Sequence, residues 1–126
     1  MTPSFASTSI DPDNLLAGDN PQPKVVSMVL TKAEVVVRGH VLGQVTADEK
    51  LLICLNAATD GSEVPRFIAQ TAADATAAEI SILVYAEGEF NQDQLTLGTG
   101  TTVANARQLL MDKNIYLVDP VTATPA

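Results

Sequence analysis

The side chains best suited to chemistry in this chain are His40 and the carboxylate pair of Glu87 and Glu89. A histidine can act alone as a base, and two carboxylates about 5 to 10 Å apart can hydrolyse a glycosidic bond. Such pairs sit in sugar clefts lined by aromatic rings, and this chain has no Trp, two Tyr and three Phe. We therefore expect no enzyme: His40 lies at a strand end, and Glu87-Gly88-Glu89 forms a turn between strands.

Metal and cofactor patterns fail on spacing. The acidic stretch 11–19 suggests a calcium loop, but an EF-hand that starts at Asp11 would need Gly and Glu where this chain has Leu16 and Gln22. With one His and one Cys, zinc and iron have no ligand set. The stretch 98–102 resembles a phosphate-binding loop without its lysine, which favours a plain turn and helix cap. We expect no metal and no cofactor.

Composition excludes other classes of partner. The 126 residues carry a formal net charge of −8, with seven basic and fifteen acidic side chains, which opposes nucleic-acid binding. No apolar run approaches the roughly 20 residues that cross a bilayer, and the N-terminus lacks the pattern of a signal peptide. Cys54 cannot form an internal disulfide, and its apolar neighbours predict a buried thiol. We expect a protein made in the cytoplasm that binds no membrane.

The chain divides into three parts. Residues 1–14 are rich in Ser, Thr and Pro and contain only two sizeable apolar side chains, Phe5 and Ile10, so they predict a flexible N-terminal arm. Residues 15–118 contain the apolar runs of a single β-rich domain. Residues 119–126 predict a short C-terminal tail.

Short apolar runs separated by turn residues predict a mainly β domain. The run 50–55 is nearly all apolar and is expected to be buried on both faces. The stretch 56–62 is expected to be a loop, and the connector 70–78 to hold at most a helical turn. The expected strands are 24–30, 34–38, 40–45, 50–55, 64–69, 79–86 and 115–118.

One short helix is predicted before the last strand. Thr101 or Thr102 can cap it, apolar residues recur at helical spacing after that point, and Asn114 is a suitable stop. Within the strands, Gly43 predicts a bend or a close backbone approach. The pair Asp60-Gly61 predicts a turn with a positive φ.

Several short motifs occur in a specific order along the chain, and together they carry a resemblance. In order and spacing they resemble the head decoration protein family of tailed bacteriophages, typified by the capsid-stabilising protein D of phage lambda. The resemblance covers roughly residues 15–118. The motifs are Leu15–Asp19, Arg38–Gly43, Asp60–Val64, Gly88–Asn91 and Ile115–Leu117. The structural residues that the resemblance marks are Gly18, Asp19, Arg38, Gly39, Gly43, Asp60, Gly61, Gly88, Glu89, Phe90 and Tyr116.

The resemblance implies a fold and a role. The fold would be mainly β, a bent-ribbon or β-tulip-like (β-clip) domain with one short C-terminal helix. The protein would be a homotrimer on the outer surface of the virion. It would bind the expanded head at three-fold and quasi-three-fold positions and hold subunits of the major capsid protein together against the pressure of packaged DNA. It would need no cofactor.

The resemblance also implies that the N-terminal arm becomes ordered on the shell, where it adds a strand to the capsid protein. The expected capsid-binding residues are Phe5, Ser7, Thr8, Ser9 and Ile10. An alternative from a different class is a small β module that binds carbohydrate or another ligand, since a fold does not fix a function. The scarcity of aromatic side chains counts against it.

Overall fold

The computed structural model describes residues 15–18 and 23–118. Within them the chain is mainly β with one short α-helix near its C-terminal end, as predicted, while the β-tulip-like arrangement stays a prediction. None of the described helices is long and apolar enough to cross a membrane. The elements are β1 (Leu16–Gly18), β2 (Lys24–Leu30), β3 (Val35–Val36), β4 (Val41–Gln44), β5 (Leu51–Ile53), β6 (Pro65–Ala69), β7 (Ala73–Asp74), β8 (Ile80–Asn91), the 3-10 helix η2 (Gln92–Gln94), α1 (Val103–Met111) and β9 (Ile115–Val118).

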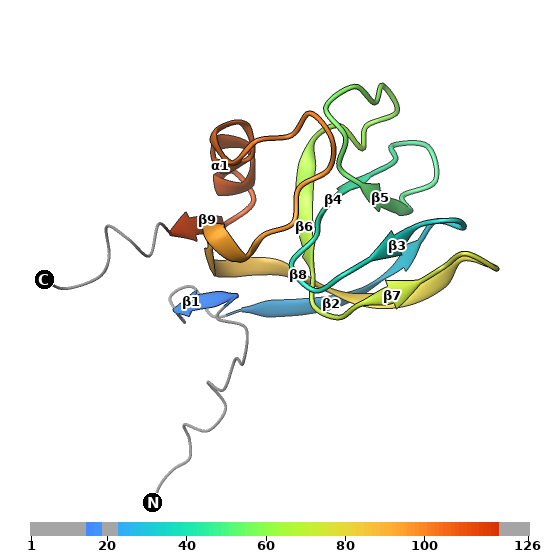
Figure 1. Cartoon of the computed structure of the whole chain (residues 1–126), viewed down its shortest axis with the longest axis horizontal. Helices are drawn as coiled ribbons and strands as arrows, with labels where there is room; N and C mark the ends of the chain where they lie inside the picture. Colours follow the sequence, from blue (N-terminus) through green and yellow to red (C-terminus); the bar gives the residue numbers. More distant parts are fainter. Residues whose placement is uncertain (1–14, 19–22, 119–126) are drawn as a thin grey trace, which may run out of the picture.

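The twelve-residue strand β8 joins the elements of the sheet. Its first part pairs antiparallel with β2, from Leu30 opposite Ile80 onward, and also with β6. Its last part pairs antiparallel with β1 and parallel with β9. Figure 1 shows the result: α1 and β9 lie at one end of the domain, and β3 and β7 lie at the other.

Two apolar cores lie against opposite faces of the sheet. The helix-side core takes Tyr85 and Phe90 from β8, whose ring centroids are 5.1 Å apart. The β7-side core takes Ile82 and Val84 from the same strand. Because successive side chains of a strand point to opposite faces, Tyr85 lies on the opposite face from Ile82 and Val84. The irregularity of the strand near Glu87 and Gly88 then places Phe90 on the same side as Tyr85. The remaining buried members of the helix-side core are Leu15, Val41, Cys54, Ile68, Ala106, Leu110 and Ile115, and those of the β7-side core are Leu30, Val36, Leu42, Leu51, Phe67, Ala69 and Ala75.

The helix begins where the sequence predicts, whereas it ends at Met111, before the predicted stop at Asn114. Thr102 is the N-cap, and its Oγ1 accepts a hydrogen bond from the Asn105 amide at 3.2 Å. Thr101 instead donates its hydroxyl to the Cys54 carbonyl at 3.0 Å. Asn114 adopts a φ of 65°, the left-handed conformation expected of a stop, three residues after α1 ends.

The predicted turn at Glu87-Gly88-Glu89 is wrong, because these residues lie inside β8. Gly88 is paired with Ile115 of β9, and Glu89 is paired with both Gly18 and Tyr116. Gly88 has a φ of 146°, and the register of the β2 pair shifts near Glu87, so the strand is irregular here without ending. The strands that pair with it here, β1 and β9, are the first and the last of the described strands in the sequence.

Two other expectations need correction. The connector 70–78 contains β7, paired with β3, in place of a helical turn, and an Asp74–Thr76 side-chain hydrogen bond closes the turn that follows. The run 50–55 is a strand only to Ile53 and is not buried on both faces, since the Leu55 side chain is 41% exposed. Apolar composition alone does not report which face a neighbouring element covers.

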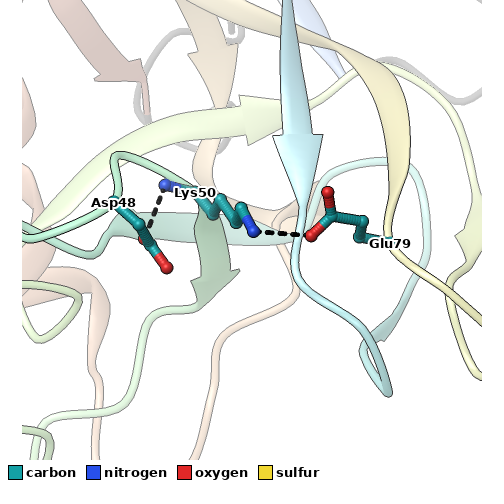
Figure 2. A network of polar contacts seen from close by, with 3 residues as sticks. All are labelled: Asp48, Lys50 and Glu79. Atoms are coloured by element: carbon teal, nitrogen blue, oxygen red, sulfur yellow. Dashed lines mark hydrogen bonds and ion pairs between the residues drawn. The ribbon is translucent and has the colours of Figure 1, made fainter.

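An ion pair ties the start of β5 to the start of β8. The Lys50 ammonium lies 2.6 Å from a Glu79 carboxylate oxygen, and the Lys50 amide donates to Asp48 Oδ1 at 3.0 Å (Figure 2). Glu79 raises the pKa of Lys50 by hydrogen bonding and by charge. Because the pair is exposed to solvent, it contributes little to stability.

Gly43 makes a close backbone approach, one of the two possibilities that the sequence leaves open. A Cβ on this residue would lie 2.0 Å from the Ser62 carbonyl oxygen, which is a backbone atom that cannot rotate away. The contact fixes the loop 56–62 against β4, next to the register shift between Leu42 and Gly43.

We predict that Gly43→Ala lowers the free energy of unfolding by about 2 kcal/mol or more, because the new methyl group overpacks against the backbone. Gly100→Ala is the matched control. There the nearest atom is the Asn56 Cβ at 3.1 Å and φ is 83°, so the cost is mainly backbone strain of about 1 kcal/mol. Chemical denaturation measures both variants. An equal or smaller loss for Gly43→Ala would contradict the close approach.

We predict that Cys54 is unreactive in the folded protein. The thiol is fully buried, donates to the Glu63 carbonyl at 3.3 Å, and has its pKa raised, chiefly by burial, so little thiolate is present or accessible. An aromatic disulfide reagent at pH 8 should react about 100-fold or more slowly with native than with denatured protein. Comparable rates would contradict the burial of Cys54.

Candidate functional site

The residues expected to bind the capsid, Phe5, Ser7, Thr8, Ser9 and Ile10, lie outside the described residues, as does Asp19. The structure does describe where this segment joins the domain. Leu15 is fully buried in the helix-side core, and its carbonyl accepts the Asn91 amide at 2.8 Å. The next residue, Leu16, is paired with Phe90 of β8. The residue that directly follows this segment is therefore held firmly against β8.

Three of the motifs meet at this same part of β8. Glu89 is paired with Gly18 of β1 across one edge and with Tyr116 of β9 across the other. Phe90, the next residue, is fully buried. The resemblance therefore marks residues that are far apart in sequence and adjacent in the sheet. They lie where the first strand, β1, and the last strand, β9, both pair with β8.

The Arg38-Gly39 motif has a structural role. Arg38 Nη1 donates to the Gln70 carbonyl at 2.9 Å and to the Tyr85 hydroxyl at 3.2 Å, and the guanidinium lies 5.8 Å from the Tyr85 ring centroid. Gly39 has a φ of 94°, and its amide donates to the Ala69 carbonyl at 2.9 Å. Arg38 thus holds β6 and β8 together and is not a free cation.

The Asp60-Gly61 motif closes the loop that packs on Gly43. Asp60 Oδ1 accepts both the amide and the hydroxyl of Ser62, at 3.0 and 2.6 Å, and these bonds lower the pKa of Asp60. Gly61 has the predicted positive φ, 106°, and donates its amide to Glu63 Oε1 at 2.8 Å. The acidic side chains of this motif satisfy the backbone of their own loop.

An open groove of about 550 Å³ lies beside this loop. Charged side chains of both signs line it, Glu49 and Glu63 together with Arg66 and Lys113, and no aromatic side chain is among its lining residues. Sugar-binding faces stack rings against the ligand. The groove therefore gives no support to the carbohydrate-binding alternative.

The residues considered for chemistry lie on different elements, His40 beside β4 and the glutamate pair within β8. His40 lies at the start of β4, where its Nδ1 accepts the Val37 amide at 3.1 Å, while Glu87 and Glu89 lie in β8 next to β2 and β1. No group of three or more His, Cys, Asp or Glu side chains in the described part of the chain could hold a metal ion. His40 is thus engaged by its own turn.

We predict that His40 makes stability depend on pH. The fold uses the neutral ring as an acceptor, and burial lowers the pKa of His40 below 6.5, only partly opposed by the charge of Glu34. Since the folded state then binds the proton less readily than the unfolded state, stability is complete above pH 6.5. It falls as the pH decreases from there toward the folded pKa.

The comparison is with His40→Asn, in which a side-chain oxygen can still accept the Val37 amide but does not titrate. Urea denaturation at several values from pH 7.5 to about 5 should show a decline for the parent protein and a flatter profile for the variant. His40 is the single histidine, and the lowered pKa values of Asp60 and Asp74 keep those groups out of this window. Parallel profiles would contradict the assignment.

Comparison with known proteins identifies the family. The model of the family described as "Bacteriophage lambda head decoration protein D" matches residues 5–112, which is most of the chain and includes the expected arm residues. No curated protein sequence matches the chain. The family match agrees with the mainly β fold and with motifs whose side chains support the structure. This chain therefore belongs to the family of bacteriophage lambda head decoration protein D.

Proposed function

We propose that the protein is a homotrimer that binds the outside of the expanded phage head at three-fold and quasi-three-fold positions. There it holds neighbouring subunits of the major capsid protein together against the pressure of packaged DNA. The observation that carries this proposal is the family match over residues 5–112, since decoration of the phage head is the role of the family. Catalysis is no part of it.

The fold supports such a role because the domain is a small rigid body. Both cores share β8. The polar side chains of the motifs hydrogen-bond to nearby backbone groups, so they stabilise the fold. A protein that fastens a shell must transmit force between its contacts without deforming, and a closely packed interior provides that stiffness.

The contact with the shell is assigned to the N-terminal arm, residues 1–14. Leu15 and β1 fix the point at which the arm leaves the domain, against the last part of β8. In this proposal the arm adds a strand to the capsid protein, with Phe5 and Ile10 as apolar anchors and main-chain hydrogen bonds supplying affinity. Ser7, Thr8 and Ser9 lie between those anchors and carry no charge that would oppose burial.

Three arms on one trimer explain how weak contacts can give firm attachment. Ordering one segment of this kind costs about 2 to 5 kcal/mol, so a single arm binds weakly. Once the first arm has docked, the others bind at high effective concentration, and avidity can rise by about 10²- to 10⁴-fold. Preference for the expanded shell then requires only that the docking sites be absent or misplaced before expansion.

We predict that a chain beginning at Leu15 still trimerises but no longer binds expanded heads, because the domain is complete without the arm while the shell contacts are lost. Sedimentation of purified expanded heads with the protein measures binding, and cryo-electron microscopy of the same mixture shows whether density occurs at three-fold sites. Undiminished binding by the shortened chain would refute the role of the arm.

The full-length variant Phe5→Ala/Ile10→Ala tests the same point without shortening the chain. It should bind heads at least about 10-fold more weakly, since two apolar side chains leave the contact. Thr2→Ala, a small change in the same segment, is the matched control and should bind as the parent protein does. Equal affinity of all three proteins would remove the apolar anchors from the proposal.

A further inference from the structure

On one face of the β2–β8 pair, several side chains belong to neither core of the described domain, although Tyr85 on the same face is buried in the helix-side core. In an antiparallel pair, residues directly opposite each other share a face, and here Ser27 is opposite Leu83 and Val29 is opposite Ser81. The alternate residues of both strands, among them Ile82 and Val84, pack into the β7-side core. We call this set the outer β2–β8 face. It consists of four exposed residues, Val25, Ser27, Ser81 and Leu83, and of Val29, which is half-buried.

The outer β2–β8 face is apolar and uncharged at its centre. Leu83 is 45% exposed and Val25 is 38% exposed, and the two serines are exposed beside them. Among the residues that the structure describes, charged side chains lie at its borders. Arg38 lies over the ring of Tyr85, which is opposite Val25, and the Lys50–Glu79 pair lies beyond Ile80 at the other end.

Two other exposed aliphatic side chains have charged neighbours. Val35 is paired with Asp74 across the β3–β7 sheet. Leu109 lies on α1 about one helical turn before Asp112 and Lys113. An apolar centre with a charged border is the pattern of a protein interface, and it distinguishes the outer β2–β8 face from these positions.

We propose that the outer β2–β8 face is the surface through which copies of this chain contact one another. The inference rests on the proposed homotrimer and assigns its interface. In the trimer the face of each copy lies near the three-fold axis, so that Leu83 of one copy meets Leu83 of the others.

The reason is electrostatic as well as hydrophobic. Each chain carries a net charge of −8, so identical copies repel one another and any contact that buries a carboxylate is opposed. A partner with a basic surface would bind more tightly if carboxylates lay in the contact. A second copy of an acidic chain binds most favourably through a surface that has no carboxylates. The outer β2–β8 face meets that condition and also removes apolar surface from water.

The test is Leu83→Glu in the full-length protein. Since Leu83 is half exposed and outside both cores, the variant should fold, and circular dichroism and thermal melting check this. Around a three-fold axis the substitution places three carboxylates together, and we expect the dissociation constant for self-association to rise about 100-fold or more in analytical ultracentrifugation. Leu109→Glu, at a position 39% exposed on α1, is the matched control and should associate as the parent does. Unchanged association of Leu83→Glu would overturn the inference.

A second variant does not depend on tolerance of a charge. Leu83→Cys should form disulfide-linked dimers between copies when a mild oxidant is added, both free in solution and bound to heads, because cysteine Cα atoms about 4.4 to 6.8 Å apart can be bridged. Leu109→Cys should not, and the buried Cys54 stays outside the reaction. No cross-link from Leu83→Cys in either state would overturn the inference.

The result separates this inference from the proposed function. Failure of the parent protein to bind expanded heads would refute the function whatever its state of association. Binding of heads by the parent, combined with a Leu83→Glu variant that stays trimeric but no longer binds them, would assign the outer β2–β8 face to the capsid protein. That outcome would overturn the inference while leaving the function intact.

Discussion

The sharing of β8 between two cores is the constraint on which the rest of the domain depends. Tyr85 and Phe90 pack on the helix side, whereas Ile82 and Val84 pack on the β7 side, and β8 pairs directly with β1, β2, β6 and β9. A shift of β8 by one residue would exchange the two sets of side chains and empty both cores at once. Register is therefore specified from both faces, which gives a small domain with few aromatic residues a single well-defined structure.

Polar side chains in this domain serve the backbone. Arg38 donates to a carbonyl at the end of β6, Asp60 accepts from its own loop, and Glu34 accepts the Ile53 amide at 3.0 Å. His40 accepts the amide of Val37 in the same way. These side chains therefore stabilise the shape of the domain. This agrees with membership of a structural family whose role depends on where its surfaces lie.

The two proposed contacts lie at different parts of β8. Leu15, which follows the segment assigned to the shell, lies against the last part of β8. Leu83 and the uncharged face around it lie on the first part of the same strand and are assigned to neighbouring copies. The continuous hydrogen-bonded strand between them provides a stiff connection. Force on an arm would thus be carried directly into the trimer.

Local sequence was sufficient for β2, for the final strand and for the start of the helix near Thr101 and Thr102, because apolar patterning and capping oxygens express preferences of the residues themselves; the structure chose Thr102 as the cap. It also offered a close backbone approach as one of two possibilities at Gly43, but did not identify the Ser62 carbonyl that makes it. Only the tertiary structure decided that Glu87-Gly88-Glu89 continues as strand and that Leu83 is left uncovered. Pairing with strands from distant parts of the chain supplies hydrogen bonds and burial that outweigh the turn preference of a glycine between two glutamates, and no local pattern carries that information.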